Sequence, residues 1–363
     1  MSVQPILQQN DFSKNDIVEL LLSQGEEMQH LFVAASRIKL ENVGNKVYLR
    51  GLIEWSNVCR KDCYYCGIRR SNNQVHRYSL SEDETMDAIR FAYEKGFGSI
   101  AIQSGELQSR SFIEKIDRIL KKTDEMTQGR LGITLSCGEQ TEAVYRHWFD
   151  LGAARYLLRI ETSSEQLYRK LHPDDEDHRY ATRLKALESL KKIGYQVGTG
   201  VMIGLPFQSV EDLADDLLFM KRMDIAMCGM GPYVEHHETP LYAYKNLLLP
   251  LSERLSLSLK MIAVLRMLMP DINIAATTAL QAIDQNARMK AITIGANVLM
   301  PNITPKHFRD DYFLYENKPL SSQSDEEELL FLEEQLRIIG HEIGFFRQGN
   351  SLHYQSQGFE KLF

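Results

Sequence analysis

Hydrophobic residues occur along the chain in short runs of strand length, separated by stretches with the periodicity of helices. Strand-like apolar runs are found at residues 47–54, 99–104, 132–136, 154–160, 197–203, 226–231, 273–277 and 297–300. Helical spacing of apolar residues is found at 111–122, 142–151, 179–193, 211–223 and 252–269. Strands that alternate with helices pair in parallel, and eight such units over about 250 residues match a closed barrel. We therefore predict an α/β protein built as a TIM-type (β/α)8 barrel, with an open doubly wound sheet as the alternative.

Helix starts are marked by serines that stand three residues before Glu, Gln or Asp. Ser81, Ser163 and Ser209 have this arrangement, which is typical of a capping box. Residues 15–41 have the spacing of two helices before the barrel, and residues 324–340 that of one helix with an acidic start. We therefore expect an N-terminal helical extension (1–44), the barrel (45–318), and a C-terminal helix and tail packed on the barrel (319–363).

The composition is that of an ordinary globular protein, with 44% hydrophobic and 25% charged residues in a chain of 363. Lys and Arg number 42 and Asp and Glu number 49, which leaves a net charge of −7. This balance argues against binding to nucleic acid or a membrane surface, because such proteins present a basic face. No apolar run reaches the roughly 18 to 20 residues of a membrane span. The first residues also lack a secretion signal, and we expect a cytoplasmic protein.

Three of the five cysteines stand within eight residues, at Cys59, Cys63 and Cys66. The cysteines are clustered, their total number is odd, and the chain shows no secretion signal. These features favour a metal or iron–sulfur cluster site over a disulfide framework. They follow the first predicted strand, and active sites of (β/α)8 barrels are built from the loops after the strands. Gaps of three and two residues let one loop present three thiolates to three corners of a [4Fe–4S] cube, for which cysteine is the usual ligand. The fourth iron would then be open to a small molecule.

A structural zinc site is the alternative for these cysteines. Zinc in such sites takes four ligands, usually in paired motifs. The next cysteine, Cys137, is 71 residues beyond Cys66, and only His76 is near enough in sequence to complete a local set. We expect Cys137 and Cys228 to be buried small hydrophobic residues. The neighbours His236 and His237 are expected to be a loop feature, with a metal role left open.

The loop from Cys59 to Cys66, with Tyr65 before its last cysteine, resembles the signature of the radical S-adenosylmethionine (SAM) superfamily. The resemblance implies that Cys59, Cys63 and Cys66 hold one [4Fe–4S] cluster, whose open iron binds SAM. An electron from the cluster would then cleave SAM to methionine and a 5′-deoxyadenosyl radical. In such enzymes the cofactor supplies the radical, and the protein supplies positioning and the exclusion of side reactions.

The same resemblance implies SAM-binding residues at the ends of later strands. Ser104, Gly105 and Glu106 stand where backbone carbonyls hold the SAM amino group, although the family's usual first Gly is Ser here. A simple strand-to-helix turn is the alternative for Gly105. Glu161 would meet the SAM ribose or amino group, and Arg183 its carboxylate, which suits the fork of arginine donors. The residues expected to pack on the adenine are Tyr65, Met202 and Ile203.

Further segments narrow the resemblance to the HydE family of [FeFe]-hydrogenase maturases, in the biotin synthase-like branch. They lie at 53–63, 103–106, 134–139, 155–162, 169–171, 229–232, 239–241, 275–278 and 295–302. The resemblance implies adenosyl-radical attack on a cysteine-ligated iron carbonyl cyanide unit, in assembly of the diiron subsite of the hydrogenase. A partner radical SAM maturase would deliver this organometallic small molecule, and a scaffold maturase would accept the product. Ferredoxin or flavodoxin would donate the electron.

Polar residues at other strand ends suit an anionic guest of this kind. Arg159 stands among apolar neighbours and needs a buried anionic partner, so we expect it to anchor the cysteine carboxylate of the substrate. The other candidate substrate-site residues are the hydroxyl donors Thr134, Ser104, Thr277 and Thr278, the apolar wall residues Met230 and Met300, and Tyr312 and Tyr315, which would close the barrel mouth. For the threonines and methionines, strand propensity and core packing are the alternatives.

Two other functions remain open at this point. The first is a HydE-like radical SAM enzyme of the methylornithine synthase or biotin synthase type that acts on a small amino acid. The second is a non-catalytic Fe–S or zinc protein.

Some members of the HydE family carry a second cysteine motif near the C-terminus, but the corresponding stretch 320–327 has no cysteine and none follows Cys228. We therefore expect no auxiliary cluster.

Overall fold

Parallel strands form a closed ring in sequence order. The computed structural model describes residues 2–9, 11–319 and 324–357. The strands of the ring are β1 (Lys46–Ser56), β2 (Ser99–Ser104), β3 (Gly132–Ser136), β4 (Arg155–Leu157), β5 (Gln196–Thr199), β7 (Met227–Cys228), β9 (Asn273–Ile274) and β10 (Val298–Leu299). Val298 pairs with Tyr48 of β1 and also bridges Ala275, directly after β9, so the ring closes. The predicted (β/α)8 barrel is confirmed.

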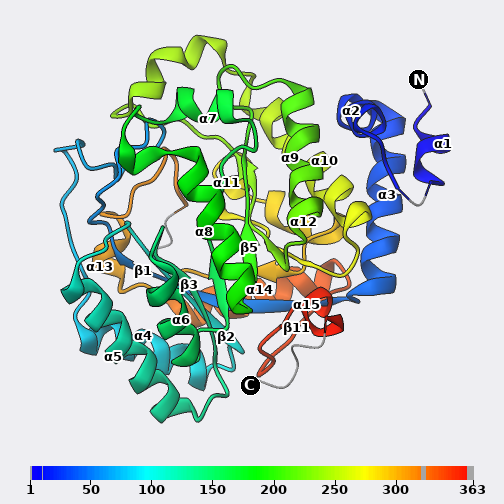
Figure 1. Cartoon of the computed structure of the whole chain (residues 1–363). Helices are drawn as coiled ribbons and strands as arrows, with labels where there is room; N and C mark the ends of the chain where they lie inside the picture. Colours follow the sequence, from blue (N-terminus) through cyan, green and yellow to red (C-terminus); the bar gives the residue numbers. More distant parts are fainter. Residues whose placement is uncertain (1, 10, 320–323, 358–363) are drawn as a thin grey trace.

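Helices follow the strands and cover the outside of the ring (Figure 1). They are α4 (Glu82–Glu94), α5 (Arg110–Thr127), α6 (Glu142–Asp150), α7 (Glu165–Leu171), α8 (Tyr180–Ile193), α9 (Val210–Met223), α10 (Leu251–Leu268), α11 (Thr278–Gln281), α12 (Ala287–Ile294) and α13 (Lys306–Arg309). Ser81 and Ser209 close capping boxes, as predicted. The predicted cap at Ser163 is wrong by one residue. The Ser163 N–H is held by Asp216, and it is the hydroxyl of Ser164 that accepts the Leu167 N–H and begins α7.

Short elements extend the side of the ring on which the strands end. β6 (Met202–Ile203) continues beyond β5 and pairs in parallel with β8 (Gly231–Pro232), which continues beyond β7. The 3-10 helices η1 (Glu176–His178) and η2 (Pro240–Leu247) lie in the connections that follow α7 and β8. These pieces raise the wall of the barrel around its mouth.

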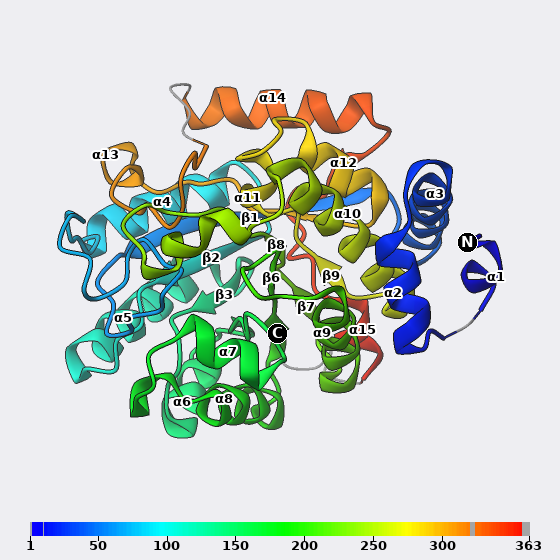
Figure 2. The same ribbon diagram turned by 90° about the horizontal axis from the view of Figure 1, so that it is seen from above.

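The two ends of the chain pack on the outside of the barrel. The helices α1 (Gln4–Leu7), α2 (Lys14–Leu22) and α3 (Gly25–Asn42) lie at one side, where α2 contacts α9 and α3 contacts α10 (Figures 1 and 2). At the other end come α14 (Asp325–Ile338), β11 (Glu342–Ile343) and α15 (Leu352–Ser356). The predicted boundaries at 44/45 and 318/319 stay predictions. Residues 320–323, next to the second boundary and in the stretch compared for an auxiliary cluster, lie outside the described residues.

The segment after β11 closes the end of the ring at which the strands begin. β11 pairs with the start of β1, and the carbonyl of Gln348 accepts a hydrogen bond of 2.9 Å from Nη2 of Arg155. A Cβ added at Gly98 would lie 1.7 Å from the carbonyl oxygen of Arg347, so this strand start needs glycine to let the tail approach. The tail thus covers one end of the barrel, opposite the mouth.

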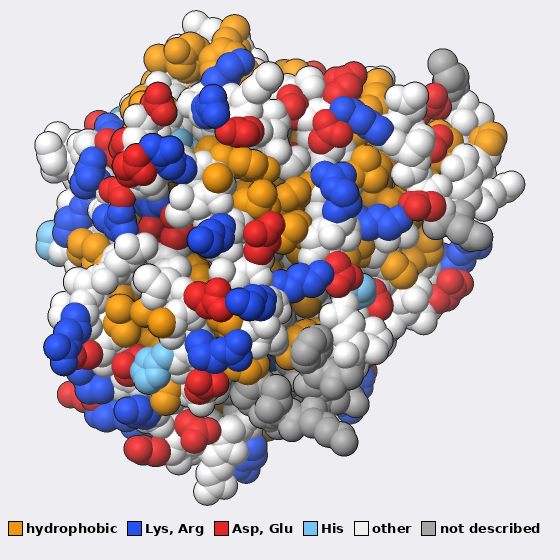
Figure 3. All heavy atoms as spheres, in the orientation of Figure 1, with side chains coloured by type: hydrophobic (Ala, Val, Ile, Leu, Met, Phe, Trp, Pro, Cys, Tyr) orange, Lys and Arg blue, Asp and Glu red, His pale blue; other side chains and the backbone are white. Residues whose placement is uncertain are grey.

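The surface carries mixed charge. On the face shown in Figure 3, Lys and Arg side chains are interspersed with Asp and Glu. Hydrophobic side chains are visible at the top of this face. The large hydrophobic residues exposed to solvent include Tyr244 and Leu247 of η2. Across the part of the chain that the structure describes, no helix has both the length and the apolar character needed to cross a bilayer.

Candidate active site

A cavity of about 340 Å³ lies inside the ring, on the side where the strands end. It brings together side chains from the loop after β1, from the ends of the other strands and from the segment after β10. The predicted residues that line it are Cys59, Cys63, Cys66, Tyr65, Ser104, Gly105, Glu106, Thr134, Arg159, Glu161, Arg183, Met202, Thr277, Thr278, Met300, Tyr312 and Tyr315. Residues that are up to 256 positions apart in sequence therefore face one enclosed space.

Two predicted site residues point away from the cavity. The side chains of Ile203 and Met230 are fully buried in the hydrophobic core. Successive residues of a strand point to opposite faces. Because Met202, Gly229 and Gly231 face the cavity, Ile203 and Met230 face the surrounding helices, and their expected places at the adenine and in the apolar wall are corrected.

The cysteine loop, residues 59–66, is held against the end of β2. Cys59 Sγ accepts a hydrogen bond of 3.3 Å from the Glu106 N–H, and the Arg60 N–H donates to the Glu106 carbonyl at 2.8 Å. A Cβ at Gly105 would lie 2.3 Å from the carbonyl oxygen of Val58, so only glycine allows this contact. The sequence-based interpretation of Gly105 as a simple turn therefore understates its role, which is to seat the cysteine loop.

The three thiols of this loop suit a cluster with cysteine ligands. All are free, Cys63 is buried, and burial raises the pKa of the Cys66 thiol to about 12. Within the described ranges no three Cys, His, Asp or Glu side chains are grouped closely enough to hold a single metal ion. All three cysteines line the cavity. This donor set fits a [4Fe–4S] cube, whose irons take one thiolate each and compensate the buried negative charge.

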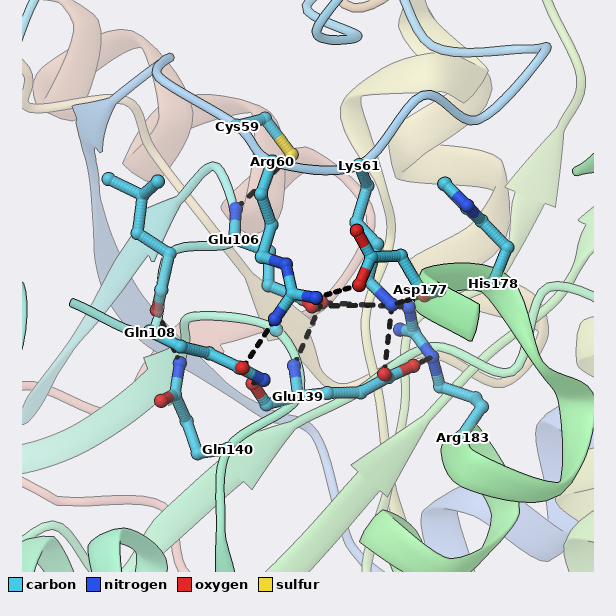
Figure 4. A network of polar contacts seen from close by, with 12 residues as sticks. Cys59, Arg60, Lys61, Glu106, Gln108, Glu139, Gln140, Asp177, His178 and Arg183 are labelled. Carbon is cyan, nitrogen blue, oxygen red and sulfur yellow. Dashed lines mark hydrogen bonds and ion pairs between the residues drawn. The ribbon is translucent and has the colours of Figure 1, made fainter. Parts of the chain in front are cut away.

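Four charged side chains form a buried network behind the cysteine loop (Figure 4). Nζ of Lys61 lies 2.9 Å from Oε2 of Glu139 and 3.3 Å from Oε1 of Glu106. Nε of Arg183 lies 2.6 Å from Oε1 of Glu139, and its Nη1 donates to the Arg159 carbonyl at 3.2 Å. Burial and the neighbouring Glu139 raise the pKa of Glu106. Burial works the same way on Glu139, but Arg183 and Lys61 outweigh it and hold the pKa of Glu139 below its usual value.

Sequence reasoning missed two members of this network. Lys61 lies between Cys59 and Cys63 in sequence, and its side chain is buried and also donates to the Asp177 carbonyl. Glu139 stands in one of the segments that carry the family resemblance, but nothing in the sequence shows which group it meets. The local sequence signal for Glu139 is the glycine before it, at the end of a strand. Gly138 has φ +71°, and this backbone conformation turns Glu139 toward Lys61.

Arg159 finds an anionic partner inside the protein. Its Nη2 donates to the Val201 carbonyl at 2.9 Å and lies 3.1 Å from Oε2 of Glu161, while about a third of its side chain stays accessible. Glu161 has φ +67°, a strained value for a residue with a side chain, and burial raises the pKa of its carboxyl. Nearby, the Thr134 hydroxyl is buried and makes no hydrogen bond with the described residues. Such orphaned polar groups at a cavity indicate a bound polar ligand.

The mouth of the cavity is covered by a strap, residues 311–318. The Tyr312 hydroxyl accepts from Gln103 at 3.3 Å, and the Tyr315 hydroxyl lies 2.9 Å from Oγ1 of Thr278. Nζ of Lys318 lies 2.6 Å and 2.8 Å from the two carboxylate oxygens of Glu54, on β1. This buried ion pair, which sequence reasoning also missed, ties the strap to the barrel wall.

The remaining singled-out residues have structural contacts. Cys137 is buried behind β2 and is not among the residues that line the cavity, whereas Cys228 is buried but does line it. The His236 and His237 rings stack at 5.1 Å, and Nδ1 of His237 lies 2.7 Å from Oε1 of Glu316 in the strap. The histidines thus help to seat the strap.

Comparisons with known proteins agree with this site. The model of the radical SAM superfamily matches residues 53–220. The chain is 38% identical over 339 residues to "[FeFe] hydrogenase maturase subunit HydE" of Thermotoga maritima, which covers 93% of this chain and 94% of that protein. It is 29% identical over 298 residues to 3-methylornithine synthase of Methanosarcina acetivorans, with 81% and 80% covered. The crystal structure of methylornithine synthase superposes with a TM-score of 0.78 at 22% identity, covering 98% of this chain and 99% of that one, and shows the same fold.

Proposed function

This chain belongs to the radical SAM superfamily as a HydE-like maturase, and on that premise we propose that it acts in assembly of the [FeFe]-hydrogenase diiron subsite. Its substrate in this proposal is a cysteine-ligated iron carbonyl cyanide unit, attacked by an adenosyl radical. The observation that carries the proposal is the presence, in one cavity, of a three-cysteine loop, Arg159 and a Thr134 hydroxyl that makes no hydrogen bond with the described residues. That combination suits a radical initiator beside an anionic guest.

Members of this superfamily use a [4Fe–4S] cluster and SAM, which together supply a 5′-deoxyadenosyl radical. In this chain Cys59, Cys63 and Cys66 would be the three protein ligands of the cluster. Glu106 lines the cavity, and its Oε1 has only a 3.3 Å contact to Lys61, which it could exchange for the SAM ammonium. Arg183 would hold the SAM carboxylate, and Tyr65 and Met202 offer apolar surface for the adenine. No second cluster is part of the proposal.

The substrate would lie deeper in the cavity, between Arg159 and the opposite strand ends. Arg159 would bind the cysteine carboxylate, since part of its guanidinium remains accessible beside Glu161. The Thr134 hydroxyl is free to donate to carboxylate or cyanide. Thr277 and Thr278 would join it by exchanging their hydrogen bonds to the Met230 carbonyl and the Tyr315 hydroxyl for bonds to the guest. Met300 would add apolar wall, and Tyr312 and Tyr315 of the strap would separate the guest from solvent water.

The relative from Thermotoga maritima is named as a subunit of a maturase system, which supports involvement of this chain with other maturases. We propose that a partner radical SAM maturase delivers the substrate, that a scaffold maturase accepts the product, and that ferredoxin or flavodoxin reduces the cluster. A cytoplasmic location is part of the same proposal.

A small amino acid is the second candidate substrate, because methylornithine synthase shares both sequence and fold with this chain. Lysine has a carboxylate that Arg159 could bind equally well, so the anion anchor alone does not separate the two. The cyanide ligand of the iron unit would accept hydrogen bonds from the threonine hydroxyls of the cavity. The apolar part of a lysine side chain would leave the Thr134 hydroxyl without a partner.

The deciding experiment is anaerobic turnover of the reconstituted protein with SAM and each candidate substrate. We expect SAM cleavage to be slow alone and to accelerate with the cysteine-bound iron dicarbonyl cyanide unit. Mass spectrometry and EPR should then find the adenosyl group on the iron complex or its cysteine sulfur. Rearrangement of lysine with no response to the iron unit would transfer the assignment to the second candidate.

A further inference from the structure

The buried network behind the cysteine loop divides its two carboxylates between two tasks. Glu106 lines the cavity, whereas Glu139 lies behind it and does not line it. Glu139 makes the short contacts to both cations, at 2.9 Å to Lys61 and 2.6 Å to Arg183. Glu106 is farther from the same cations, at 3.3 Å and 3.8 Å. The carboxylate that faces away from the cavity therefore carries most of the charge pairing.

Glu139 also fixes the orientation of Glu106. The Glu139 N–H donates to Oε2 of Glu106 at 2.9 Å, while Oε1 of Glu106 accepts no hydrogen bond from the described residues. Gly138 makes this approach possible, because a Cβ there would lie 2.3 Å from the Glu106 side chain. The result is a Glu106 carboxylate whose Oε2 is held by the Glu139 N–H and whose Oε1 has only the 3.3 Å contact to Lys61.

Lys61 connects this arrangement to the cysteine loop. It stands between Cys59 and Cys63 in sequence, its side chain is 4% exposed, and it donates to the Asp177 carbonyl as well as to Glu139 (Figure 4). Arg60 pairs with the Asp177 side chain, and the Asp62 N–H donates to Nε2 of His178 at 2.8 Å. Arg60 and Asp62 are thus tied to η1, and Lys61 is tied both to η1 and to Glu139.

We propose that Glu139 is a positioning residue for SAM. By pairing closely with Lys61 and Arg183, it leaves Glu106 only longer contacts to both cations, so that Oε1 of Glu106 can exchange its contact with Lys61 for an ammonium group in the cavity. Through Lys61 it also sets that oxygen and Arg183 in register with the three thiols. This inference rests on the proposed assignment of Glu106 and Arg183 to the SAM amino and carboxylate groups.

A purely structural role for Glu139 would be charge balance. The network holds two acidic and two basic groups, so any single substitution leaves one buried charge without its partner and lowers stability. In Glu139→Gln, the positioning role further predicts that Lys61 and Arg183 draw the Glu106 carboxylate toward themselves. The affinity for SAM then falls, because the ammonium loses its acceptor.

The double variant Lys61→Met/Glu139→Gln separates the two roles. It removes one charge of each sign, so the network is balanced again and the melting temperature of the cluster-free chain should recover toward wild type. Glu106 and Arg183 are left to pair with each other, so the dissociation constant for SAM should stay raised by about tenfold or more, as is typical when a supporting residue behind a ligand is lost. Glu142→Gln is the matched control, because Glu142 pairs with Lys192 at the surface.

The measurements are SAM binding to the anaerobically reconstituted protein by equilibrium dialysis, and the change in the EPR spectrum of the reduced cluster when SAM is added. We expect both single and double variants to take up a normal amount of iron, and to show weak SAM binding and a diminished EPR change. Wild-type affinity in the double variant, or in Glu139→Gln alone, would overturn the positioning role. The experiment uses no substrate, so a chain that binds SAM but ignores the iron–cysteine unit would refute the proposed function and leave this result standing.

Discussion

The ion pair between Lys318 and Glu54 holds the strap over the barrel mouth, and its removal tests that closure. Nζ of Lys318 lies 2.6 Å and 2.8 Å from the Glu54 oxygens and 2.8 Å from the Tyr312 carbonyl, and the Lys318 and Glu54 side chains are 6% and 3% exposed. Among the described residues, Lys318→Met would leave the Asn302 amide as the remaining hydrogen-bond partner of the buried Glu54 carboxylate. Removing one member of a buried pair costs about 3–5 kcal/mol, and we expect the free energy of unfolding to fall by that amount at about pH 8.

The deficit should depend on pH, with a sign that follows from burial. Burial raises the pKa of the Glu54 carboxyl in the folded state, and Lys318 partly opposes this rise. Without the lysine the pKa rises further, so the folded variant takes up a proton at a pH where the unfolded chain stays ionised. A neutral carboxyl needs no cation, and the deficit should shrink as the pH falls from about 8 toward 5.

Urea unfolding of the cluster-free chain, followed by circular dichroism over this pH range, measures the effect. The control is Lys318→Met/Glu54→Gln, which removes both charges and should recover most of the lost stability. A deficit that is constant with pH, or that persists in the double variant, would refute the reasoning. In the active protein, a loosened strap should also admit solvent deuterium into 5′-deoxyadenosine, which mass spectrometry would detect.

Other predictions concern the site and the tail. Replacing all three cysteines of the cysteine loop by alanine should remove the about four irons per chain expected of one cubane, and iron analysis that still finds a cluster would contradict this. Arg183→Ala should weaken SAM binding, whereas Arg159→Ala should leave SAM bound and abolish product formation. Each variant loses a contact worth about 2–5 kcal/mol. An equal loss of SAM affinity in both variants, measured in a binding assay, would show that the two roles are misassigned. The carboxylates of Asp271 and Asp224 accept hydrogen bonds from the His353 ring and raise the pKa of His353 to about 9. The stability that this contact of the C-terminal tail contributes is therefore fully present below about pH 6.5 and is lost as the pH rises through about 9. Unfolding curves of His353→Gln should not show this loss of stability with rising pH. A variant with the same pH profile as the wild type would contradict the prediction.

Much of the fold and part of the site could be read from the sequence, because those features are encoded locally. Strands and helices follow from the spacing of apolar residues, and β2 and β3 have the same bounds in the structure as in the prediction. The cysteine loop is contained in eight residues, and its place after β1 follows from chain order alone. The positions of Arg159 and Glu161 in the cavity follow in the same way, from strand ends meeting at one face of a parallel barrel. Arg183 stands on α8 instead, and its place at the cavity was expected from the family resemblance.

Contacts between distant segments were decided only by the tertiary structure. Glu139 meets Lys61 across 78 positions, and Lys318 meets Glu54 across 264, so no local pattern could pair them. The short strand pieces beyond β5 and β7 set which neighbours face inward, and this turned Met230 and Ile203 away from the cavity. Residue types and their order determine which elements form, but the pairing of buried charges depends on how the whole ring closes, because each charge is stable in the interior only where a partner from another part of the chain reaches it.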